Sequence, residues 1–390
     1  SWGVDYLKYD NCSATLDIVT QYRTMRDALQ TASAGTGRPI VLSICSWSFG
    51  EWQLGTGQLW RTTGDISDTW ASLMANVAAT RPLAPYAGPN GWNDPDMLEV
   101  GNGTTTDAED RAHFSMWSIL AAPLIAGNNL STVPLSTLAI LTNKEVIDVD
   151  QDALGMQGVP ANVTGSSEVW VKPLNASGAR AVVLLNRGTA PADITVRIGD
   201  IGLRPGGANV RDLWAHADVG VVDDSYTATV PPHDVAMLKI MGSELPAPAG
   251  SVFLSDIPWT YATSAGGFVA RDKRNASTAP LTLSGQTHDK GLGVFAGSLV
   301  QYRLGQACST FSATVGVDSQ SGSAGSVVFQ VFADGEKLFD SGVMTGATPA
   351  QAVSVDVTGK RRLKLLATNG GDGTDNDYAD WADAKLDCAP

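Results

Sequence analysis

Residues 4–10 read Val4-Asp5-Tyr6-Leu7-Lys8-Tyr9-Asp10, a short stretch with the composition of a strand that ends in charged side chains. Residues 14–32 follow with apolar positions at helical spacing, which are Leu16, Val19, Tyr22, Met25 and Leu29. Residues 39–45 form a second apolar strand, and helices are expected over residues 68–79 and 108–125. This alternation predicts a parallel sheet with crossover helices, in which polar residues after each strand point at a common mouth.

The rest of the sequence has a different pattern. From about residue 158, short strands with period-two alternation replace the mixed pattern. Residues 159–241 are predicted to form a compact antiparallel β-sandwich, and residues 251–390 a second all-β module. Residues 242–250, which are rich in Gly, Pro and Ala, have the composition of a linker.

The composition limits the possible functions. The 390 residues have a net charge of −14, and an acidic chain repels phosphate backbones, so nucleic-acid binding is not expected. No apolar run approaches the roughly 18 residues of a membrane span. The 11 Trp and 41 Gly residues fit a protein that handles carbohydrates, although composition alone does not establish this function.

The four cysteines exclude a dense disulfide framework in a chain of this size. Cys308 and Cys388 lie near the first and last strands of the C-terminal segment and are predicted to form a disulfide. Cys12 and Cys45 follow core strands, and either both are buried thiols or Cys12 has lost a partner. Because a disulfide implies export, we expect a secreted, extracellular protein.

Carboxylates recur at the ends of the predicted N-terminal strands. Asp10, Asp65 and Asp96 each follow an apolar segment, and turn chemistry is the alternative explanation for any one of them. Two carboxylates at the mouth of a barrel are what glycoside cleavage requires. Lys8 is expected to hold Asp10 ionised, and Arg61 either binds a sugar hydroxyl or tunes Asp65.

These segments resemble the signatures of glycoside hydrolase family 27, the α-galactosidase and α-N-acetylgalactosaminidase family. The resemblance rests on the order and spacing of Leu7–Cys12, Trp60–Ile66, Ala87–Leu98 and Glu145–Gly155. It implies a TIM barrel followed by an antiparallel β-sandwich, and hydrolysis of α-galactoside-containing oligo- or polysaccharides with retention of configuration.

Residue by residue, the resemblance implies Asp10 as nucleophile and Asp65 as general acid/base. Retention then predicts that the two carboxyl groups lie about 5–5.5 Å apart. Lys8, Arg61 and Asp96 would bind sugar hydroxyls, and Met97 and Cys12 would line the pocket.

The resemblance also predicts a partial barrel. The family's nucleophile ends the fourth barrel strand, so residues 1–158 correspond to the C-terminal strands of the barrel, against about 250 residues for a complete one. We therefore expect the 390-residue chain alone to be inactive on aryl α-galactosides or poorly folded.

Specificity depends on the loop after the second strand. Ser46 stands where α-galactosidases of the family often have Glu, a residue that contacts the sugar 2-hydroxyl, and the N-acetylgalactosaminidases resemble this chain in having Ser there. Those enzymes need a small residue three positions later to admit the acetamido group, and this chain has Phe49 at that position. An α-galactosidase is the leading interpretation. An α-N-acetylgalactosaminidase and a β-L-arabinopyranosidase are the alternatives.

Residues 251–390 resemble the NPCBM module, carbohydrate-binding module family 51, through segments around Trp259, Phe295 and Trp381. These three aromatics are the candidate sugar contacts, and Phe295 replaces a His of the family pattern. A non-catalytic galactoside-binding protein that works through this module is the rival hypothesis. No cofactor or catalytic metal is expected, because the four His lack metal-ligand spacing, but the Asp-rich residues 372–377 suit a structural Ca²⁺.

Overall fold

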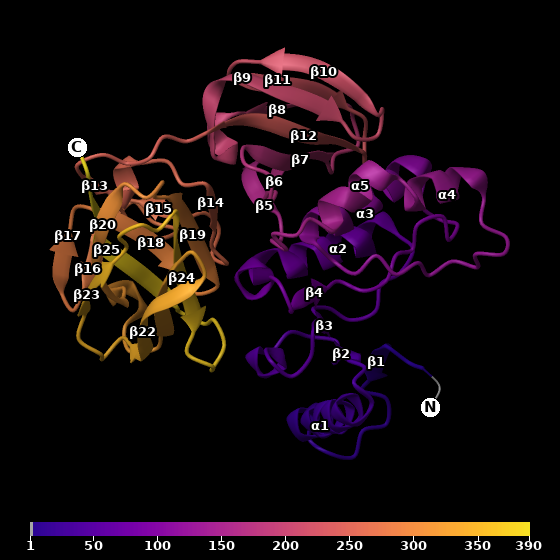
Figure 1. Cartoon of the computed structure of the whole chain (residues 1–390), viewed down its shortest axis with the longest axis horizontal. Coiled ribbons are helices and arrows are strands. Elements are labelled where there is room, and N and C mark those ends of the chain that lie inside the picture. Colours follow the sequence, from indigo (N-terminus) through magenta and orange to yellow (C-terminus); the bar gives the residue numbers. More distant parts are fainter. Residues whose placement is uncertain (1–2) are drawn as a thin grey trace.

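The computed structural model describes residues 3–390, which fold into an α/β part, a β-sandwich and a C-terminal β module (Figure 1). The α/β part contains a parallel sheet with the strand order β1-β2-β3-β4, as the alternating sequence pattern predicts. Its strands are β1 (Tyr6–Asp10), β2 (Val41–Cys45), β3 (Leu59–Arg61) and β4 (Trp92–Asp94). Its helices are α1 (Ile18–Thr36), α2 (Trp70–Thr80), α3 (Asp107–Leu120), α4 (Leu135–Leu141) and α5 (Lys144–Asp150), with 3₁₀ turns η1 (Glu51–Gln53) and η2 (Arg81–Tyr86).

Local backbone conformation and capping explain where α1 begins and where α1 and α3 end. The Asp17 side chain accepts hydrogen bonds from the N–H groups of Val19 and Thr20, so α1 begins later than the apolar spacing suggests. The same helix ends at Gly37, which adopts the left-handed conformation with φ 69°. Helix α3 ends at Leu120 because Ala121 is left-handed, five residues before the predicted end at residue 125.

Both edges of the parallel sheet are open among the described residues. Strand β1 pairs only with β2, and β4 pairs only with β3. The register places Asp10 opposite Cys45, and Arg61 opposite Asp94. Since the strands are parallel, these residues gather at the carboxyl edge of the sheet.

The β-sandwich follows directly after α5. Its six-stranded sheet has the order β10-β9-β12-β7-β6-β5, and β11 and β8 form a separate pair. The strands are β5 (Val159–Thr164), β6 (Ser167–Pro173), β7 (Ala179–Asn186), β8 (Ala192–Arg197), β9 (Leu203–Asp212), β10 (Ala217–Val222), β11 (Ser225–Val230) and β12 (Val235–Glu244), with η3 (Gly199–Ile201). Because β12 extends to Glu244, residues 242–244 belong to the sheet and not to the predicted linker.

The C-terminal module contains two larger sheets and a small hairpin. One sheet has the order β15-β18-β25-β20-β23 with β13 also on β25, the other has the order β14-β19-β24-β21-β22, and β16 pairs with β17. Cys308 and Cys388 form a disulfide between β20 and β25, which confirms the predicted pair. The elements are β13 (Ser251–Phe253), η4 (Leu254–Asp256), β14 (Tyr261–Thr263), β15 (Ala270–Arg271), β16 (Leu281–Leu283), β17 (Gln286–His288), β18 (Gly291–Phe295), β19 (Ser298–Arg303), β20 (Cys308–Val317), η5 (Ser319–Ser321), β21 (Ser326–Ala333), β22 (Glu336–Thr345), β23 (Gln351–Asp356), β24 (Arg362–Asn369) and β25 (Tyr378–Cys388).

The module packs against the other two parts. Tyr261 and Leu299 of the module share a buried apolar cluster with Ala84 of η2 and with the strands of the β-sandwich. The Tyr261 hydroxyl donates a hydrogen bond of 2.9 Å to the Gln157 carbonyl. In Figure 1 the module accordingly lies beside both the β-sandwich and the α/β part. Across residues 3–390, no helix is both long and apolar enough to cross a membrane.

Candidate active site

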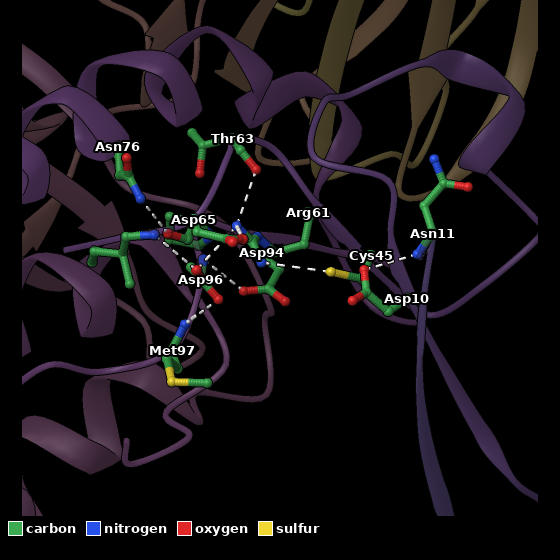
Figure 2. A network of polar contacts seen from close by, with 12 residues as sticks. Asp10, Asn11, Cys45, Arg61, Thr63, Asp65, Asn76, Asp94, Asp96 and Met97 are labelled. Atoms are coloured by element: carbon green, nitrogen blue, oxygen red, sulfur yellow. Dashed lines mark hydrogen bonds and ion pairs between the residues drawn. The ribbon is translucent and has the colours of Figure 1, made fainter. Parts of the chain in front are cut away.

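The carboxyl edge of the parallel sheet carries a connected group of polar side chains, shown in Figure 2. Asp10 ends β1, Arg61 ends β3 and Asp94 ends β4, while Asp65 and Asp96 lie in the loops that follow β3 and β4. Asn76 of α2 supports the last loop by donating a hydrogen bond of 2.8 Å to the Pro95 carbonyl.

Arg61 connects the loops after β3 and β4. Its side chain is only 2% exposed, and its Nη2 lies 3.1 Å from Asp65 Oδ1 and 3.0 Å from Asp96 Oδ2. The same nitrogen donates to the Thr63 carbonyl at 3.2 Å, and Nη1 lies 3.6 Å from the Cys45 sulfur. A guanidinium suits this position because its planar fork directs several donors at fixed angles.

Asp96 is buried and is bound by protein groups on both carboxylate oxygens. Its Oδ2 accepts the Ile66 N–H at 3.0 Å, and its Oδ1 accepts the Met97 N–H at 2.9 Å. Lys8 Nζ lies 3.4 Å from Oδ1. The backbone of Asp96 has a φ of 90°, a strained conformation for a residue with a side chain.

Asp94 belongs to a quoted motif but received no role from sequence reasoning. It is buried, and its Oδ1 accepts the Asp96 N–H at 2.9 Å, so it fixes the strained turn after β4. Burial raises the pKa of the Asp94 carboxyl, against the opposing charges of Lys8 and Arg61. The sequence signal for this role is the Asp-Pro-Asp spacing, in which the first Asp can bind the backbone two residues later.

Asp10 is exposed, and its carboxylate is held by its neighbours in sequence. Oδ2 accepts a hydrogen bond of 2.9 Å from the Cys12 thiol, and Oδ1 accepts the Asn11 N–H at 2.8 Å. The thiol makes the largest contribution to a lowered pKa of Asp10, and Lys8 contributes only a smaller charge effect. The expectation that Lys8 helps to hold Asp10 ionised agrees with this charge effect, although the Lys8 ammonium forms its ion pair with Asp96.

Cys12 lies near both predicted catalytic carboxylates. Its hydrogen bond to Asp10 is the main cause of its raised pKa, and the negative charge of Asp65 adds to the effect. Cys12 is exposed, so it is not one of two buried thiols, whereas Cys45 is buried. The Asp65 side chain is 82% exposed beside the mouth of the sheet. The separation of 5–5.5 Å between the Asp10 and Asp65 carboxyls stays a prediction.

The loop after β2 places Ser46 inside the protein. The Ser46 hydroxyl accepts a hydrogen bond of 2.5 Å from Gln53 Nε2 and donates one of 3.2 Å to the Ser48 carbonyl. The Phe49 ring lies 4.7 Å from the Tyr86 ring and 6.3 Å from the Trp60 ring, measured between centroids. Ser46 is therefore buried with its donor and one of its two acceptor lone pairs occupied by protein groups.

Trp47 is an aromatic residue in this loop that the sequence reasoning missed. Its side chain is exposed, and its φ of 63° is unusual for a bulky residue. An exposed indole at the carboxyl edge of the sheet offers a flat apolar face to a sugar ring. The neighbouring positions Ser46 and Phe49 drew attention in the sequence, but only the fold shows that Trp47 is the accessible one. Met97, in the loop after β4, is a second exposed apolar side chain.

The three candidate aromatics of the module have different environments. Trp381 is 0% exposed and packs between Phe311 and Phe329 in the module core, so its predicted role as a sugar contact is wrong. The partly buried Trp259 ring is stacked on Arg271, whose guanidinium carbon lies 3.8 Å from the ring centroid. Phe295 makes an edge-to-face contact with Tyr378 at 5.0 Å.

The Asp-rich segment near the C-terminus makes hydrogen bonds to the start of β21. Asp372 accepts a hydrogen bond from the Ser326 hydroxyl, and Asp377 accepts one from the Ser326 N–H. In residues 3–390, no group of three or more His, Cys, Asp or Glu side chains is arranged to hold a metal ion. Calcium binding through residues 372–377 stays a prediction.

Family comparisons agree with the division into three parts. The family described as Alpha galactosidase A matches residues 1–152, and the Alpha galactosidase C-terminal beta sandwich domain matches residues 164–240. The NPCBM/NEW2 domain matches residues 250–387.

Curated relatives match the first two parts. Alpha-galactosidase 3 of Arabidopsis thaliana is 47% identical over 247 residues, which cover 61% of this chain and 55% of the relative. The alpha-galactosidase of Coffea arabica is 46% identical over 244 residues, which cover 61% of this chain and 63% of the relative. The chain thus spans less than two thirds of the length of these relatives.

Solved structures align over the same region. Alpha-galactosidase I from Mortierella vinacea aligns with a TM-score of 0.57 and 31% identity, over 63% of this chain and 70% of that chain. A GH27 β-L-arabinopyranosidase from Geobacillus stearothermophilus aligns with a TM-score of 0.55 and 27% identity, over 62% and 58% of the two chains. Together with the signature segments at the carboxyl edge of the sheet, these matches show that the chain belongs to glycoside hydrolase family 27, the α-galactosidase family, and carries an NPCBM domain.

Proposed function

We propose that this chain carries the two catalytic carboxylates of a retaining α-galactosidase, with Asp10 as nucleophile and Asp65 as general acid/base. One observation carries the proposal: the Arg61 guanidinium, which contacts Asp65 at 3.1 Å, also lies 3.6 Å from the sulfur of Cys45, the residue directly opposite Asp10 in the register of β1 and β2. Family membership supports the substrate class, which is a terminal α-D-galactosyl residue of an oligo- or polysaccharide.

The proposed reaction is a double displacement. Asp10 attacks the anomeric carbon while the bond from that carbon to the leaving oxygen breaks, and Asp65 gives its proton to that oxygen. Asp65 then takes a proton from water, the water oxygen attacks the anomeric carbon, and the bond to Asp10 breaks. The lowered pKa of Asp10 suits the first step, since the nucleophile must be ionised.

The other side chains of the edge fall into two proposed roles. Lys8, Met97 and Trp47 are at least partly exposed and are proposed to contact the sugar. Arg61 and Asp96 are buried and mutually paired, and we propose that they chiefly position the loops of Asp65 and Met97.

Assays of two proteins test the proposal. The 390-residue chain should not hydrolyse 4-nitrophenyl α-D-galactopyranoside, because both edges of its parallel sheet are open within residues 3–390. The same chain extended by the N-terminal barrel segment of the coffee relative should hydrolyse it. Turnover by the 390-residue chain would refute the expectation of inactivity, and an extended protein that folds without turnover would count against the enzymatic function.

The nucleophile is tested in the extended protein by Asp10→Asn. We expect a loss of turnover on the order of 10⁴-fold or more, with substrate binding preserved, because the covalent step is removed while the site keeps its shape. Asp27→Asn, an exposed position on α1, is the matched control and should retain activity. In Asp10→Ala, added azide should replace the missing carboxylate as the nucleophile and yield the β-galactosyl azide. Unchanged turnover in Asp10→Asn would contradict the assignment of Asp10 as nucleophile.

Two alternatives concern the sugar. The Geobacillus neighbour is a β-L-arabinopyranosidase, and Phe49 stands at the position where the N-acetylgalactosaminidases of the family are expected to need a small residue. Comparing the extended protein on aryl α-galactosides, α-N-acetylgalactosaminides and β-L-arabinopyranosides decides between them, and we expect the α-galactoside to be preferred.

The remaining proposals concern the module and export. We propose that the NPCBM domain binds galactose-type sugars through Phe295 or Trp259, and that the chain is exported, as its disulfide suggests. Titration of the 390-residue chain with methyl galactosides tests the binding.

If the chain binds the sugar but the extended protein shows no turnover, the rival hypothesis of a non-catalytic galactoside-binding protein gains support.

A further inference from the structure

A cationic groove runs along the junction of the β-sandwich and the C-terminal module, away from the carboxyl edge of the parallel sheet. Its first section has a volume of about 440 Å³. Its lining includes the charged side chains of Arg180, Glu244, Arg303, Arg361 and Arg362, together with several uncharged polar residues such as Gln301. We call this feature the arginine groove.

The groove continues into a second section of about 440 Å³ that reaches the α/β part. This section shares Gln301, Arg361 and Arg362 with the first. It adds Phe332 and Lys364, whose ammonium group lies 4.4 Å from the centroid of the Phe332 ring. Each section has the size of a small-molecule site, and together they offer both cationic groups and an apolar surface.

One of the four arginines is neutralised inside the protein. The Arg180 guanidinium donates to the backbone carbonyls of Ala179, Ile201 and Gly202 at 2.9–3.0 Å. It also lies 3.7 Å from the Glu244 carboxylate. Arg180 and Glu244 therefore form a structural pair and leave no net charge in the groove.

The other three arginines have no carboxylate partner. Within residues 3–390, the guanidinium groups of Arg303, Arg361 and Arg362 make no ion pair within 4.0 Å. Asp334 lines the second section, but its carboxylate accepts the backbone N–H groups of Arg361 and Arg362 at 2.9 and 3.0 Å and forms no ion pair with their guanidinium groups within 4.0 Å. A chain with a net charge of −14 thus concentrates unpaired cations in one groove.

The strand register keeps two of these cations next to each other. Arg303 on β19 is directly opposite Arg362 on β24. Their neighbours Tyr302 and Leu363 are buried in the module core, so the two arginines lie on the outer face of the sheet. Like charges at directly opposed positions of a β-ladder are destabilising. An anion bound between them would remove this repulsion.

We propose that the arginine groove binds the oxyanion groups of an acidic polysaccharide, either a uronate carboxylate or a sulfate ester. Guanidinium forks match the geometry of both groups and bind them in bidentate fashion. A glycan is favoured over a polyphosphate because the chain carries an NPCBM domain and belongs to a glycosidase family. The groove would hold an acidic glycan chain beside the catalytic part without contributing to the chemistry.

Calorimetric titration of the 390-residue chain tests this proposal independently of turnover. The probes are hexagalacturonate, a sulfated galactan hexasaccharide and a neutral galacto-oligosaccharide of equal length. We expect binding of at least one acidic probe that weakens with added NaCl, and no binding of the neutral probe at the groove. The preferred acidic probe distinguishes carboxylate from sulfate, and failure of both acidic probes to bind would overturn the proposal.

The double variant R361A/R362A should bind the acidic probe at least about tenfold more weakly, because it loses the charge-assisted hydrogen bonds of two guanidinium groups. The matched control is R23A/R204A, which removes two exposed arginines outside the groove and the same charge. Equal weakening in both variants would show a non-specific charge effect and would contradict the proposal. If R361A/R362A fails to fold, R361Q/R362Q provides the same comparison, with the same outcomes for and against.

Discussion

Arg61 illustrates how one buried side chain organises the carboxyl edge of the parallel sheet. Its Nη2 is shared by Asp65, Asp96 and the Thr63 carbonyl, so the loops after β3 and β4 are fixed to one group. The sequence predicts that Arg61 either binds the sugar or tunes Asp65. The structure adds a third function, which is to pair with Asp96, because the two side chains are buried together.

Trp381 provides a test at the level of one residue. The fully buried indole packs between Phe311 and Phe329, and its N–H has no hydrogen-bond partner among the described residues. Trp381→Ala should lower the free energy of unfolding of the module by about 3–5 kcal/mol through loss of buried surface and a cavity. Trp381→Phe should cost less, because it keeps an aromatic ring and removes the unpartnered N–H.

Chemical denaturation followed by far-UV circular dichroism measures both variants. Sugar titration of Trp381→Phe is the matching functional control and should give the affinity of the unchanged chain. A specific loss of sugar affinity in a stably folded Trp381→Phe would restore Trp381 as a sugar contact.

At the level of elements, the loop that carries Asp65 is joined to the start of α3. Asp68 Oδ2 accepts the Thr104 N–H at 2.6 Å, and the Thr105 hydroxyl lies 2.9 Å from Asp68 and 2.8 Å from Asp110. Burial alone would raise the pKa of Asp68, but these hydrogen bonds lower it below its ordinary value. The contact holds the loop after β3 against the loop that precedes α3.

We expect Asp68→Ala to loosen this contact. Because the Thr104 N–H loses its acceptor, its hydrogen exchange should become about tenfold faster, as for the loss of one charge-assisted bond. Hydrogen exchange measured by mass spectrometry or NMR on the 390-residue chain gives the result. Asp107→Ala is the control, since Asp107 is an exposed residue in the first turn of the same helix. Equal acceleration in both variants would show that Asp68 does not hold the loop.

At the level of the whole molecule, Glu145 connects the α/β part to the β-sandwich. Its carboxylate on α5 forms two hydrogen bonds of 2.7 and 2.8 Å with Arg211 on β9, and His216 lies 3.0 Å away. The Arg211 hydrogen bond is the main cause that lowers the pKa of Glu145 to about 2. The stabilisation is therefore complete above the ordinary pKa of a glutamate and is lost as the pH falls towards 2.

This linkage predicts a pH-dependent effect of Glu145→Gln. The variant should melt at a lower temperature than the unchanged chain at pH 6, and the difference should shrink as the pH falls from about 4.5 to about 2. Calorimetric melting curves at several pH values measure it. Asp148→Asn removes one exposed carboxylate from the same helix without touching Arg211 and should show a smaller difference. A difference that stays constant down to pH 2 would contradict the assignment.

Local sequence determines much of this protein. The order of strands and helices, the carboxylates at the strand ends and the strand positions of Cys308 and Cys388 all follow from period, capping and spacing over short segments. The Lys8–Asp96 and Arg61–Asp96 pairs, the burial of Trp381 and the arginine groove depend on tertiary structure. Each of them joins segments or environments that periodicity does not specify, because side-chain partners are set by register, loop geometry and packing in three dimensions.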